Sequence, residues 1–343
     1  MNRNRFHKLA QKYRTLRVGI LGDFCLDRYL EIDPARAETS IETGLPVCNV
    51  VKVRAQPGAA GTILNNLVAL GVGEIYPIGF CGEDGEGYEL RRALAANRAV
   101  RLDGFLQTRT RCTFTYCKPL VIELGKPLRE LNRLDTKNWT PTPAVVEDEV
   151  VASLKRLAPQ LDAIIVLDQV DIAETGVITQ RVRETIGQLA NERKERLIIA
   201  DSRRSLRGWP AVIFKMNAAE LAVLTGVSAN FELEELKRRA GLLARQQGRL
   251  VFVTLANRGM IGATPEGEVE HVPSLPVRGP IDIVGAGDAV TAALAVSLAA
   301  GATPREAIEI ASTAASVVIH QVGTTGAASP EAIVALLTAK KSN

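Results

Sequence analysis

Arg17-Val18-Gly19-Ile20-Leu21-Gly22 is an apolar run that ends in glycine, and it predicts a buried strand near the start of the chain. Similar runs predict four further buried strands, at residues 163–167, 197–200, 212–216 and 250–255. Stretches with helical patterning lie between them, including Ile172 to Lys194 and Leu233 to Gln247. Strands that alternate with helices at this spacing indicate an α/β fold, with a doubly wound, mostly parallel sheet flanked by helices.

Two stretches interrupt this alternation, Leu45 to Val53 and Cys112 to Glu123. They are rich in β-branched residues or alternate in polarity, and prolines and glycines bound them. We expect them to form a small antiparallel sheet that is inserted into the α/β body, from lid segments at residues 28–56 and 104–136. A small sheet above the strand ends would act as a lid over a ligand site.

Composition and charge exclude several classes of protein. The 343 residues are 46% hydrophobic and 23% charged, which is typical of a globular chain that buries a core without disulfide or zinc staples. Lys and Arg number 42 against 38 Asp and Glu, and a net charge of +4 gives no support for nucleic-acid binding. No apolar run approaches the ~18 residues of a membrane span, and no secretory signal is present. We therefore expect a cytoplasmic protein without a membrane partner.

The five cysteines include no C-x-x-C pair, and the three histidines lie far apart, so we expect reduced thiols and no zinc cluster. Residues 1–16 form a basic N-terminal arm, which we expect to be a solvated first helix, with a transit peptide as the alternative. Residues 17–338 would form the functional domain, and residues 339–343 a tail.

The segment Asp282-Ile-Val-Gly285-Ala286-Gly287-Asp288 precedes an apolar helix of small residues. Small residues at a helix start leave backbone N–H groups uncovered, and the helix dipole favours an anion there, most naturally a transferring phosphoryl group. The carboxylate of Asp288 would then accept the proton of an attacking hydroxyl. Two alternatives remain. The glycines could merely permit a tight turn with Asp288 as helix cap, or they could begin a dinucleotide fingerprint, although Val290 occupies its third small position.

The stretch from Asp282 to Asp288 resembles the second signature of the ribokinase / phosphofructokinase-B family of sugar kinases. Further segments resemble this family in the expected order. Gly22–Tyr29 resembles its first strand and sugar-binding loop, and Gly82–Gly87 resembles its G-x-D-x-x-G turn. Asn217–Glu220 resembles its N-x-x-E motif, and Thr254–Gly259 resembles its nucleotide-binding loop, with Ala256 in place of a glycine. The resemblance covers residues 17 to 338. It implies a ribokinase-like fold with a lid, and magnesium-dependent phosphoryl transfer from ATP to a sugar hydroxyl.

Within the family, the chain is most similar to the heptose-7-phosphate kinase domain, through Gly22–Tyr29, Pro46–Val53 and Arg133–Asp135. That domain is often fused to a nucleotidyltransferase, an activity that we expect to be absent here. The family's first signature differs, because Ala59 replaces a glycine and Thr62 takes the place of a sugar-contacting asparagine. The reaction class is therefore better supported than the acceptor.

The resemblance also implies roles for particular residues, which fall into four groups. Those expected at the catalytic centre are Gly285, Ala286, Gly287 and Asp288. Those expected at the sugar are Asp23, Asp27, Gly58, Ala59, Thr62, Asn66, Lys118 and Arg133. Those expected at the nucleotide are Asn217, Glu220, Thr254, Gly259 and Ser312. Those expected at metals are Glu220, which would hold magnesium through water, and Asp282, which with the Gly323 turn resembles a monovalent-cation (K⁺) site in some relatives.

Plainer interpretations stay open for several of these residues. Asp27 is also typical of a turn or cap aspartate, and Asn217 with Glu220 fits a helix capping box. The basic residues Arg111, Lys118 and Arg133 fall near the lid, where they would clamp a phosphate or simply be solvated charges. Asp168, Asp171 and Asp201 follow predicted strands and are weaker site candidates.

The leading hypothesis is an ATP-dependent sugar kinase, with heptose 7-phosphate as acceptor and free fructose or ribose as alternatives. A non-catalytic sugar- or nucleotide-binding protein on the same fold is a second hypothesis. A nicotinamide-dependent oxidoreductase is disfavoured because the N-terminal fingerprint is missing. We also expect a homodimer through an apolar lid face that is composed of Val47, Val50, Val51, Val53, Phe114 and Tyr116.

Overall fold

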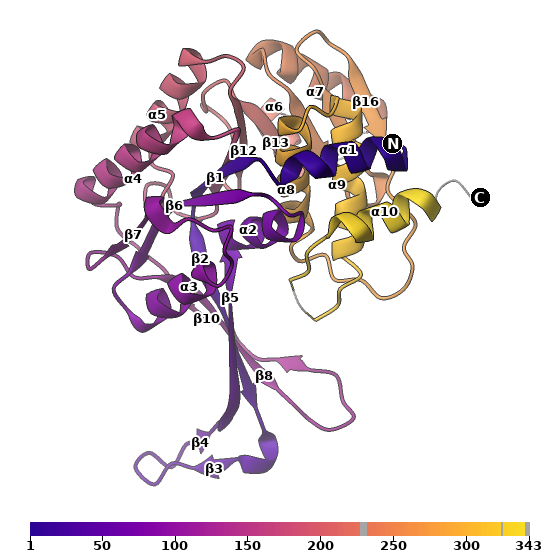
Figure 1. The fold of residues 1–343 in the computed structure, drawn as a ribbon. Coiled ribbons are helices and arrows are strands. Elements are labelled where there is room, and N and C mark those ends of the chain that lie inside the picture. The colour runs from indigo at the N-terminus through magenta and orange to yellow at the C-terminus, as the bar shows by residue number, and fades with distance from the viewer. Residues whose placement is uncertain (227–231, 324, 340–343) are drawn as a thin grey trace.

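A computed structural model describes residues 1–226, 232–323 and 325–339, and its body is a nine-stranded sheet between two layers of helices (Figure 1). Neighbouring strands are parallel from β14 to β7, and β15 and β16 run antiparallel at one edge. In spatial order the strands are β16 (Val269–Val272), β15 (Met260–Ala263), β14 (Val251–Thr254), β13 (Ile213–Asn217), β12 (Leu197–Ser202), β11 (Ala163–Asp168), β1 (Arg17–Gly22), β6 (Glu74–Gly82) and β7 (Phe105–Thr108).

Helices cover both faces of this sheet, because its strands are apolar on both sides. In β11, Ala163, Ile165 and Leu167 belong to one core cluster, whereas Ile164 and Val166 belong to the other. The first face is covered by α1 (Arg3–Tyr13), α2 (Ala60–Ala69), α3 (Gly85–Ala95), α8 (Ala286–Ala299), α9 (Pro304–Val318) and α10 (Pro330–Ala339). The second is covered by α4 (Ala144–Leu157), α5 (Gln180–Glu192), α6 (Ala218–Thr225) and α7 (Leu233–Gln247). Short 3₁₀ helices occur at Pro34–Arg36, Leu102–Gly104, Ala158–Gln160 and Ala256–Arg258.

A second sheet projects from the body as a long lid (Figure 1). Its strands are, in order, β10 (Leu134–Thr136), β8 (Phe114–Val121), β2 (Phe24–Ile32) and β5 (Val50–Ala59); β9 (Arg129–Glu130) also pairs with β8, and β3 (Glu38–Thr39) pairs with β4 (Pro46–Val47) near the tip. The register places Asp27 opposite Gln56 and Tyr116 on one face. Leu30, opposite Val53, lies on the other face.

The structure confirms the predicted α/β alternation and corrects it at two places. The helix expected from Ile172 begins only at Gln180, because residues 168–179 form a loop that wraps around the Asp23 carboxylate, and Thr179 caps the helix. The lid sheet is mixed rather than antiparallel, since β2 and β8 run parallel. Part of β2 was expected as a sugar-binding loop, but this strand runs from the body directly into the lid.

The lid boundaries also differ from the expected segments 28–56 and 104–136. The first lid strand begins at Phe24, directly after Asp23. Residues Phe105–Thr108 form β7, which pairs with β6 in the main sheet, so the second segment enters the lid only at Phe114.

Helix α1 is part of the body and not the solvated arm that its basic residues predict. Phe6, Leu9 and Tyr13 are fully buried, and the Tyr13 hydroxyl lies 3.0 Å from Ser297 Oγ of α8. Arg5 forms an ion pair with Glu306 at 2.8 Å. The basic residues therefore lie on the outer side of a helix whose apolar stripe completes the core.

The apolar outer face of the lid is smaller than the sequence indicates. Val50, Val51 and Val53 are 42%, 47% and 49% exposed. Phe114 is buried and Tyr116 shares the face of Asp27, so neither contributes to the outer face.

Across the described residues, no helix is both long and apolar enough to span a membrane, and the five cysteines are free. Of the expected tail, residues 340–343 lie outside the described part of the chain.

Candidate active site

The N-terminus of α8 forms an open anion-binding turn. Gly285 precedes the helix with φ 81° and ψ −5°, a left-handed conformation that glycine adopts without strain. Among the described residues no side chain caps this helix. The Ala286 N–H donates to Ile283 O at 3.2 Å, whereas the N–H groups of Gly287 and Asp288 remain at the positive end of the helix dipole for an anionic ligand.

A buried ion pair lies beside this turn. Lys215 of β13 places its Nζ 2.6 Å from Asp201 Oδ2 of β12, and Thr291 Oγ1 of α8 lies 3.3 Å from the same oxygen. A Cβ atom built on Gly287 would lie 3.3 Å from Lys215 Nζ. Burial opposes the lysine's charge, but the carboxylates of Asp201 and Asp288 outweigh it and raise the pKa of Lys215. The anion-binding turn thus has a fixed positive charge next to it.

Asp288 has the properties of a general base at neutral pH. Burial raises its pKa to about 7, Lys215 opposes the shift, and the carboxylates of Asp201 and Asp27 add to it. A carboxyl group with a pKa near the working pH can both accept a proton and release it. The prediction of Asp288 as the base is therefore compatible with its surroundings.

Lys215 is not among the site residues predicted from the sequence. The signal was present, because Lys215 is the one charged residue in the apolar run Ile213-Phe-Lys-Met of a strand predicted to be buried. A lysine in such a place needs a carboxylate partner. Asp201, named only as a weak candidate, is that partner.

Asp27 lies where the lid meets the body. Its Oδ1 is 3.4 Å from Lys118 Nζ across the lid sheet, and burial raises its pKa while Lys118 opposes the shift. A Cβ atom on Gly58 would lie only 2.7 Å from Asp27 Oδ2, so the glycine makes room for this carboxylate. The charge of Asp27 also raises the pKa of Asp288, so the two carboxylates lie near each other.

Asp23 has a different role from the one expected. Its carboxylate accepts hydrogen bonds from the backbone N–H groups of Gln169, Val170 and Val177, at 2.9, 3.3 and 2.7 Å. Burial, together with the charge of Asp168, raises its pKa to about 6. The side chain is 2% exposed. It anchors the loop after β11, which leaves it little capacity to bind a sugar.

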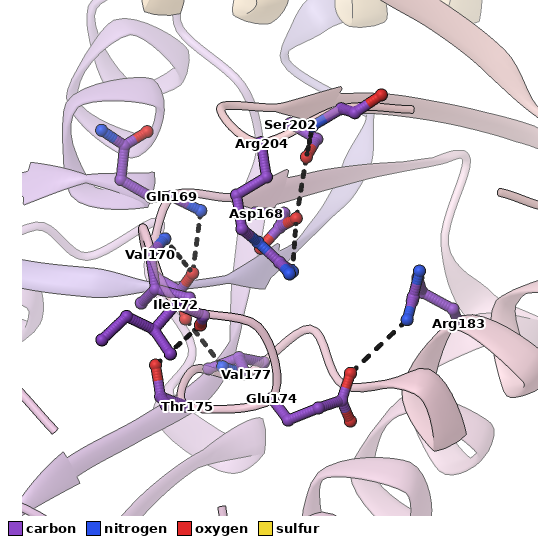
Figure 2. Close-up of polar contacts among 12 residues, drawn as sticks. Asp168, Gln169, Val170, Ile172, Glu174, Thr175, Val177, Arg183, Ser202 and Arg204 are labelled. Atoms are coloured by element: carbon purple, nitrogen blue, oxygen red, sulfur yellow. Dashed lines mark hydrogen bonds and ion pairs between the residues drawn. The ribbon is translucent and has the colours of Figure 1, made fainter. Parts of the chain in front are cut away.

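Asp168 is likewise a structural group. Ser202 and Arg204 point toward it in Figure 2, with Ser202 Oγ at 2.7 Å and Arg204 Nη2 at 2.9 Å. Asp171 lies outside this cluster and pairs with Lys137 at 2.9 Å. Neither carboxylate is free to act on a ligand without losing a partner.

The first turn of α2 joins the acceptor side to the anion-binding turn. The Thr62 methyl group lies 3.5 Å from the position of a Cβ on Gly285. Asn66, one turn further on, is buried, and its amide donates to Thr62 O at 3.0 Å, so the structure does not bring it into the site. Ala59 precedes the helix at φ 52° and ψ −116°, a conformation that normally requires glycine.

The expected nucleotide residues divide into structural and available groups. Asn217 and Glu220 form a reciprocal capping box on α6, which confirms the capping interpretation. The box uses Glu220 Oε2, which accepts the Asn217 N–H at 2.7 Å. A Cβ on Gly259 would lie 2.0 Å from Val272 O, so this glycine permits strand packing. Thr254 ends β14, and its hydroxyl donates to the backbone oxygen of Met216 at 3.4 Å.

Two serines of α9 have unused hydroxyls. Ser312 Oγ and its neighbour one turn on, Ser316 Oγ, are buried and have no hydrogen-bond partner among the residues that the structure describes. Asp282, the expected cation ligand, accepts the Val284 N–H at 3.0 Å, and its own N–H donates to Ile319 O at 2.8 Å. This pairing joins the segment before the anion-binding turn to the end of α9.

The basic lid residues are not equivalent. Arg111 is buried and donates to the backbone oxygens of Thr140, Pro141 and Thr175, so it is a structural residue and is not available to clamp a phosphate. Arg133 lies over the Tyr116 ring at 4.6 Å and pairs with Asp135 at 2.6 Å.

A model of the pfkB family of carbohydrate kinases matches residues 145–332, more than half of the chain, including β11–β14, the Lys215–Asp201 pair and the anion-binding turn. The chain belongs to this family. The matched region holds the Lys215–Asp201 pair and the anion-binding turn, whereas the lid strands β2, β5 and β8 precede it.

Curated relatives and solved structures agree with this assignment. The bifunctional protein HldE of Hyphomonas neptunium is 29% identical over 98% of this chain and 66% of that protein. The HldE protein of Nitrobacter winogradskyi is 30% identical over 93% of this chain and 63% of that protein. The kinase therefore spans less than two thirds of these relatives. One similar solved structure is Escherichia coli phosphofructokinase-2 in complex with potassium, with a TM-score of 0.70, 17% identity, and coverage of 94% of this chain and 99% of that chain. Another is Arabidopsis thaliana ribokinase complexed with ribose and ATP, with a TM-score of 0.65, 17% identity, and coverage of 94% of this chain and 98% of that chain. They show that the fold is ribokinase-like.

The strain at Ala59 predicts that replacing it with glycine stabilises the kinase. A non-glycine residue in such a conformation costs about 1–3 kcal/mol, and the added flexibility of glycine returns roughly 0.5–1 kcal/mol of that. Ala59→Gly should therefore raise the midpoint of chemical unfolding, whereas Ala93→Gly within α3 should lower it by the ordinary helical cost. A loss of stability in Ala59→Gly similar to that in Ala93→Gly would show that Ala59 is not strained.

Proposed function

We propose that this kinase transfers the γ-phosphoryl group of ATP to a hydroxyl of a phosphorylated sugar, with heptose 7-phosphate as its acceptor. The observation that carries the proposal is the position of Asp288, whose pKa is raised to about 7 at the first turn of an uncapped helix. An acceptor hydroxyl between Asp288 and the Asp27 side of the lid would be aligned for attack on a phosphoryl group at that turn.

In the proposed reaction Asp288 takes the hydroxyl proton as the sugar oxygen attacks the γ-phosphorus. A new oxygen–phosphorus bond forms, the bond to the bridging oxygen breaks, and ADP leaves. The N–H groups of Gly287 and Asp288 and the ammonium of Lys215 stabilise the charge on the transferring group. Asp27 holds the sugar through its hydroxyls. A binding protein without catalytic activity would not need a base with this pKa, which disfavours that alternative.

The residues around Lys215 are compatible with magnesium. Glu220 and Asp201 lie close enough for the Asp201 charge to contribute to the raised pKa of Glu220, with burial as the larger cause. Magnesium prefers oxygen ligands and keeps several waters, so these carboxylates would hold it through water. When bound, it neutralises charge on the ATP phosphates. The turn around Asp282 and Gly323 is proposed as a potassium site, and the five free thiols favour a cytoplasmic location.

The unpaired hydroxyls of Ser312 and Ser316 support a nucleotide at α9. Each is a buried group without a hydrogen-bond partner among the described residues, and a ligand that reached it would supply one. They lie one turn apart on one helix face, as two contacts to a nucleobase would require.

Two features favour a phosphorylated acceptor over a free sugar. The HldE relatives match almost the whole chain, and Lys118 and Arg133 lie beside Asp27 in the lid. With Arg111 excluded, these two residues are the proposed phosphate ligands. Ala59 and Thr62 differ from the family's usual residues in the acceptor loop. A free sugar is the alternative acceptor, because the structurally similar Arabidopsis thaliana ribokinase was solved with ribose.

The pH dependence of catalysis tests the role of Asp288. Because only the ionised carboxylate can accept a proton, kcat/KM should rise with pH through about 7 and then level off. Asp288→Asn should remove this limb and lower turnover roughly 10²–10⁴-fold. Burial disfavours the ionised form in the fold, so the variant should be at least as stable as the parent above neutral pH. Turnover within about tenfold of the parent would contradict the assignment.

The acceptor is tested by comparing kcat/KM for heptose 7-phosphate with those for heptose, fructose and ribose. Each charge-assisted hydrogen bond to a phosphate contributes roughly 1.5–3 kcal/mol, so Arg133→Met should lower kcat/KM about 10–100-fold for the phosphorylated acceptor and little for free sugars. Lys126→Met, in the lid beside Glu123, is the matched control and should change neither. More efficient turnover of a free sugar would refute the phosphate clamp but not the kinase.

We further propose that the apolar outer face of the lid forms a homodimer. Val53 is exposed opposite Leu30, and Val50 extends the same patch, which a second copy would cover. Val53→Glu should convert a dimer to a monomer in light scattering coupled to size exclusion. Val223→Glu, at a valine on α6 that is 62% exposed, should leave the mass unchanged. A parent protein that is monomeric at tens of micromolar would refute the proposal.

A further inference from the structure

Strand β5 connects the acceptor side of the lid to the body. It passes from the lid into the body, where α2 follows it directly (Figure 1). The register places Gln56 of β5 opposite Asp27 of β2, so the two side chains lie on the same face of the lid sheet. Two residues further on, a Cβ atom on Gly58 would lie 2.7 Å from Asp27 Oδ2. The segment that carries Gln56 is therefore packed against the carboxylate proposed to hold the sugar.

Gln56 is also joined to the anion-binding turn, through Thr325. Its Nε2 donates to Thr325 Oγ1 at 3.1 Å, although the two residues lie far apart in the sequence. The methyl group of the same threonine, Cγ2, would lie 2.8 Å from a Cβ atom on Gly285. Thr325 thus contacts the lid through its hydroxyl and the anion-binding turn through its methyl group.

The segment that carries Thr325 has a firm support just after α9. The Gln321 side chain donates from Nε2 to Ala327 O and accepts the Ala327 N–H at Oε1, both at 3.0 Å. The nearby Ile319 O accepts the N–H of Asp282, three residues before Gly285, at 2.8 Å. The end of α9 therefore fixes both Thr325 and the approach to the anion-binding turn.

A second contact joins β5–α2 to the same glycine. The Thr62 methyl group, in the first turn of α2, would lie 3.5 Å from a Cβ atom on Gly285. The acceptor carboxylate and the anion-binding turn are thus linked by continuous contacts, from Asp27 through β5 to Gly285. Phosphoryl transfer requires such a link, because the reacting atoms must be held about 3–3.5 Å apart and in line.

We infer that Gln56 and Thr325 are positioning residues for phosphoryl transfer. Their hydrogen bond fixes the lid strand that packs on Asp27 relative to the turn that receives the phosphoryl group. Neither side chain takes part in the chemistry itself. The inference rests on the proposed function, in which Asp27 holds the sugar and the α8 turn holds the transferring group. Loss of the hydrogen bond should therefore lower kcat more than it changes KM, since the groups that bind each substrate remain.

A double-mutant cycle tests this coupling in the full-length kinase. Gln56→Met keeps the side-chain length and removes the amide, and Thr325→Val keeps the methyl group against Gly285 and removes the hydroxyl. Both kcat and KM are measured for ATP and for whichever of heptose 7-phosphate, heptose, fructose and ribose is turned over best. Each single variant should lower kcat about tenfold and change either KM by less than about threefold. The double variant should also lose about tenfold, and not the roughly hundredfold loss of two independent effects.

Conservative and control variants separate positioning from a general effect on the fold. Thr325→Ser retains the hydroxyl and should keep kcat within about threefold of the parent. Lys52→Met, at an exposed residue further out on β5, is the matched control and should change neither kcat nor KM. Asp288→Asn tests the proposed function separately. Turnover near that of the parent in that variant would refute the base, whereas the cycle would still report whether Gln56 and Thr325 are coupled.

Three results would overturn the inference. They are a kcat in Gln56→Met equal to that of the parent, a double variant whose loss is the product of the two single losses, and an increase in KM with unchanged kcat. If Thr325→Val proves unfolded by circular dichroism, Gln56→Met is compared with Lys52→Met, and equal kcat values in these two variants would refute the role of Gln56.

Discussion

The ion pair between Lys215 and Asp201 determines the electrostatics of the site. Without the lysine, Asp201, Asp288 and Glu220 would be neighbouring carboxylates, each of which raises the cost of ionising the next. Asp288 would then hold its proton at neutral pH and could not act as a base. With Lys215 present, the pKa of Asp288 stays near 7 and the anion-binding turn gains a positive neighbour. In the proposed reaction, this one buried charge would thus act on both the proton that Asp288 accepts and the phosphoryl group.

A second carboxylate, Asp23, determines where the lid leaves the body. Its side chain accepts three N–H groups from the loop after β11, and its backbone oxygen accepts the N–H of Ala60 at 3.1 Å. Strand β2 begins at the next residue and helix α2 begins at Ala60. The same residue therefore holds the start of the lid, the start of the acceptor helix and one loop of the active-site edge in fixed relation. Asp27 lies four residues further along the chain, in β2, so its position depends on this anchor.

The α/β alternation, the anion-binding turn and the N-x-x-E segment could be predicted from the sequence, because each depends on the pattern of neighbouring residues. It was insufficient where a residue's partners come from distant segments. Asp23 and Asp27 belong to the same run of sequence, yet only the fold shows that loop 169–177 saturates the first and leaves the second facing the site. Arg111 looked like a phosphate ligand for the same reason, since the carbonyl groups that it binds lie about thirty to sixty residues away.

The two alanines that replace expected glycines lie in the two loops for which the family resemblance implies substrate contacts, and both have φ 52°. Such strain persists only where the surroundings over-determine the backbone. At Ala59 they do so through Gly58, which has the Asp27 carboxylate against it, and at Ala256 through Gly259, which is packed on Val272 O. If the loops were loosely held, each alanine would relax to negative φ and the loop would move with it. The two loops therefore keep a backbone conformation that suits glycine, and close packing around Gly58 and Gly259 is what holds each alanine in it.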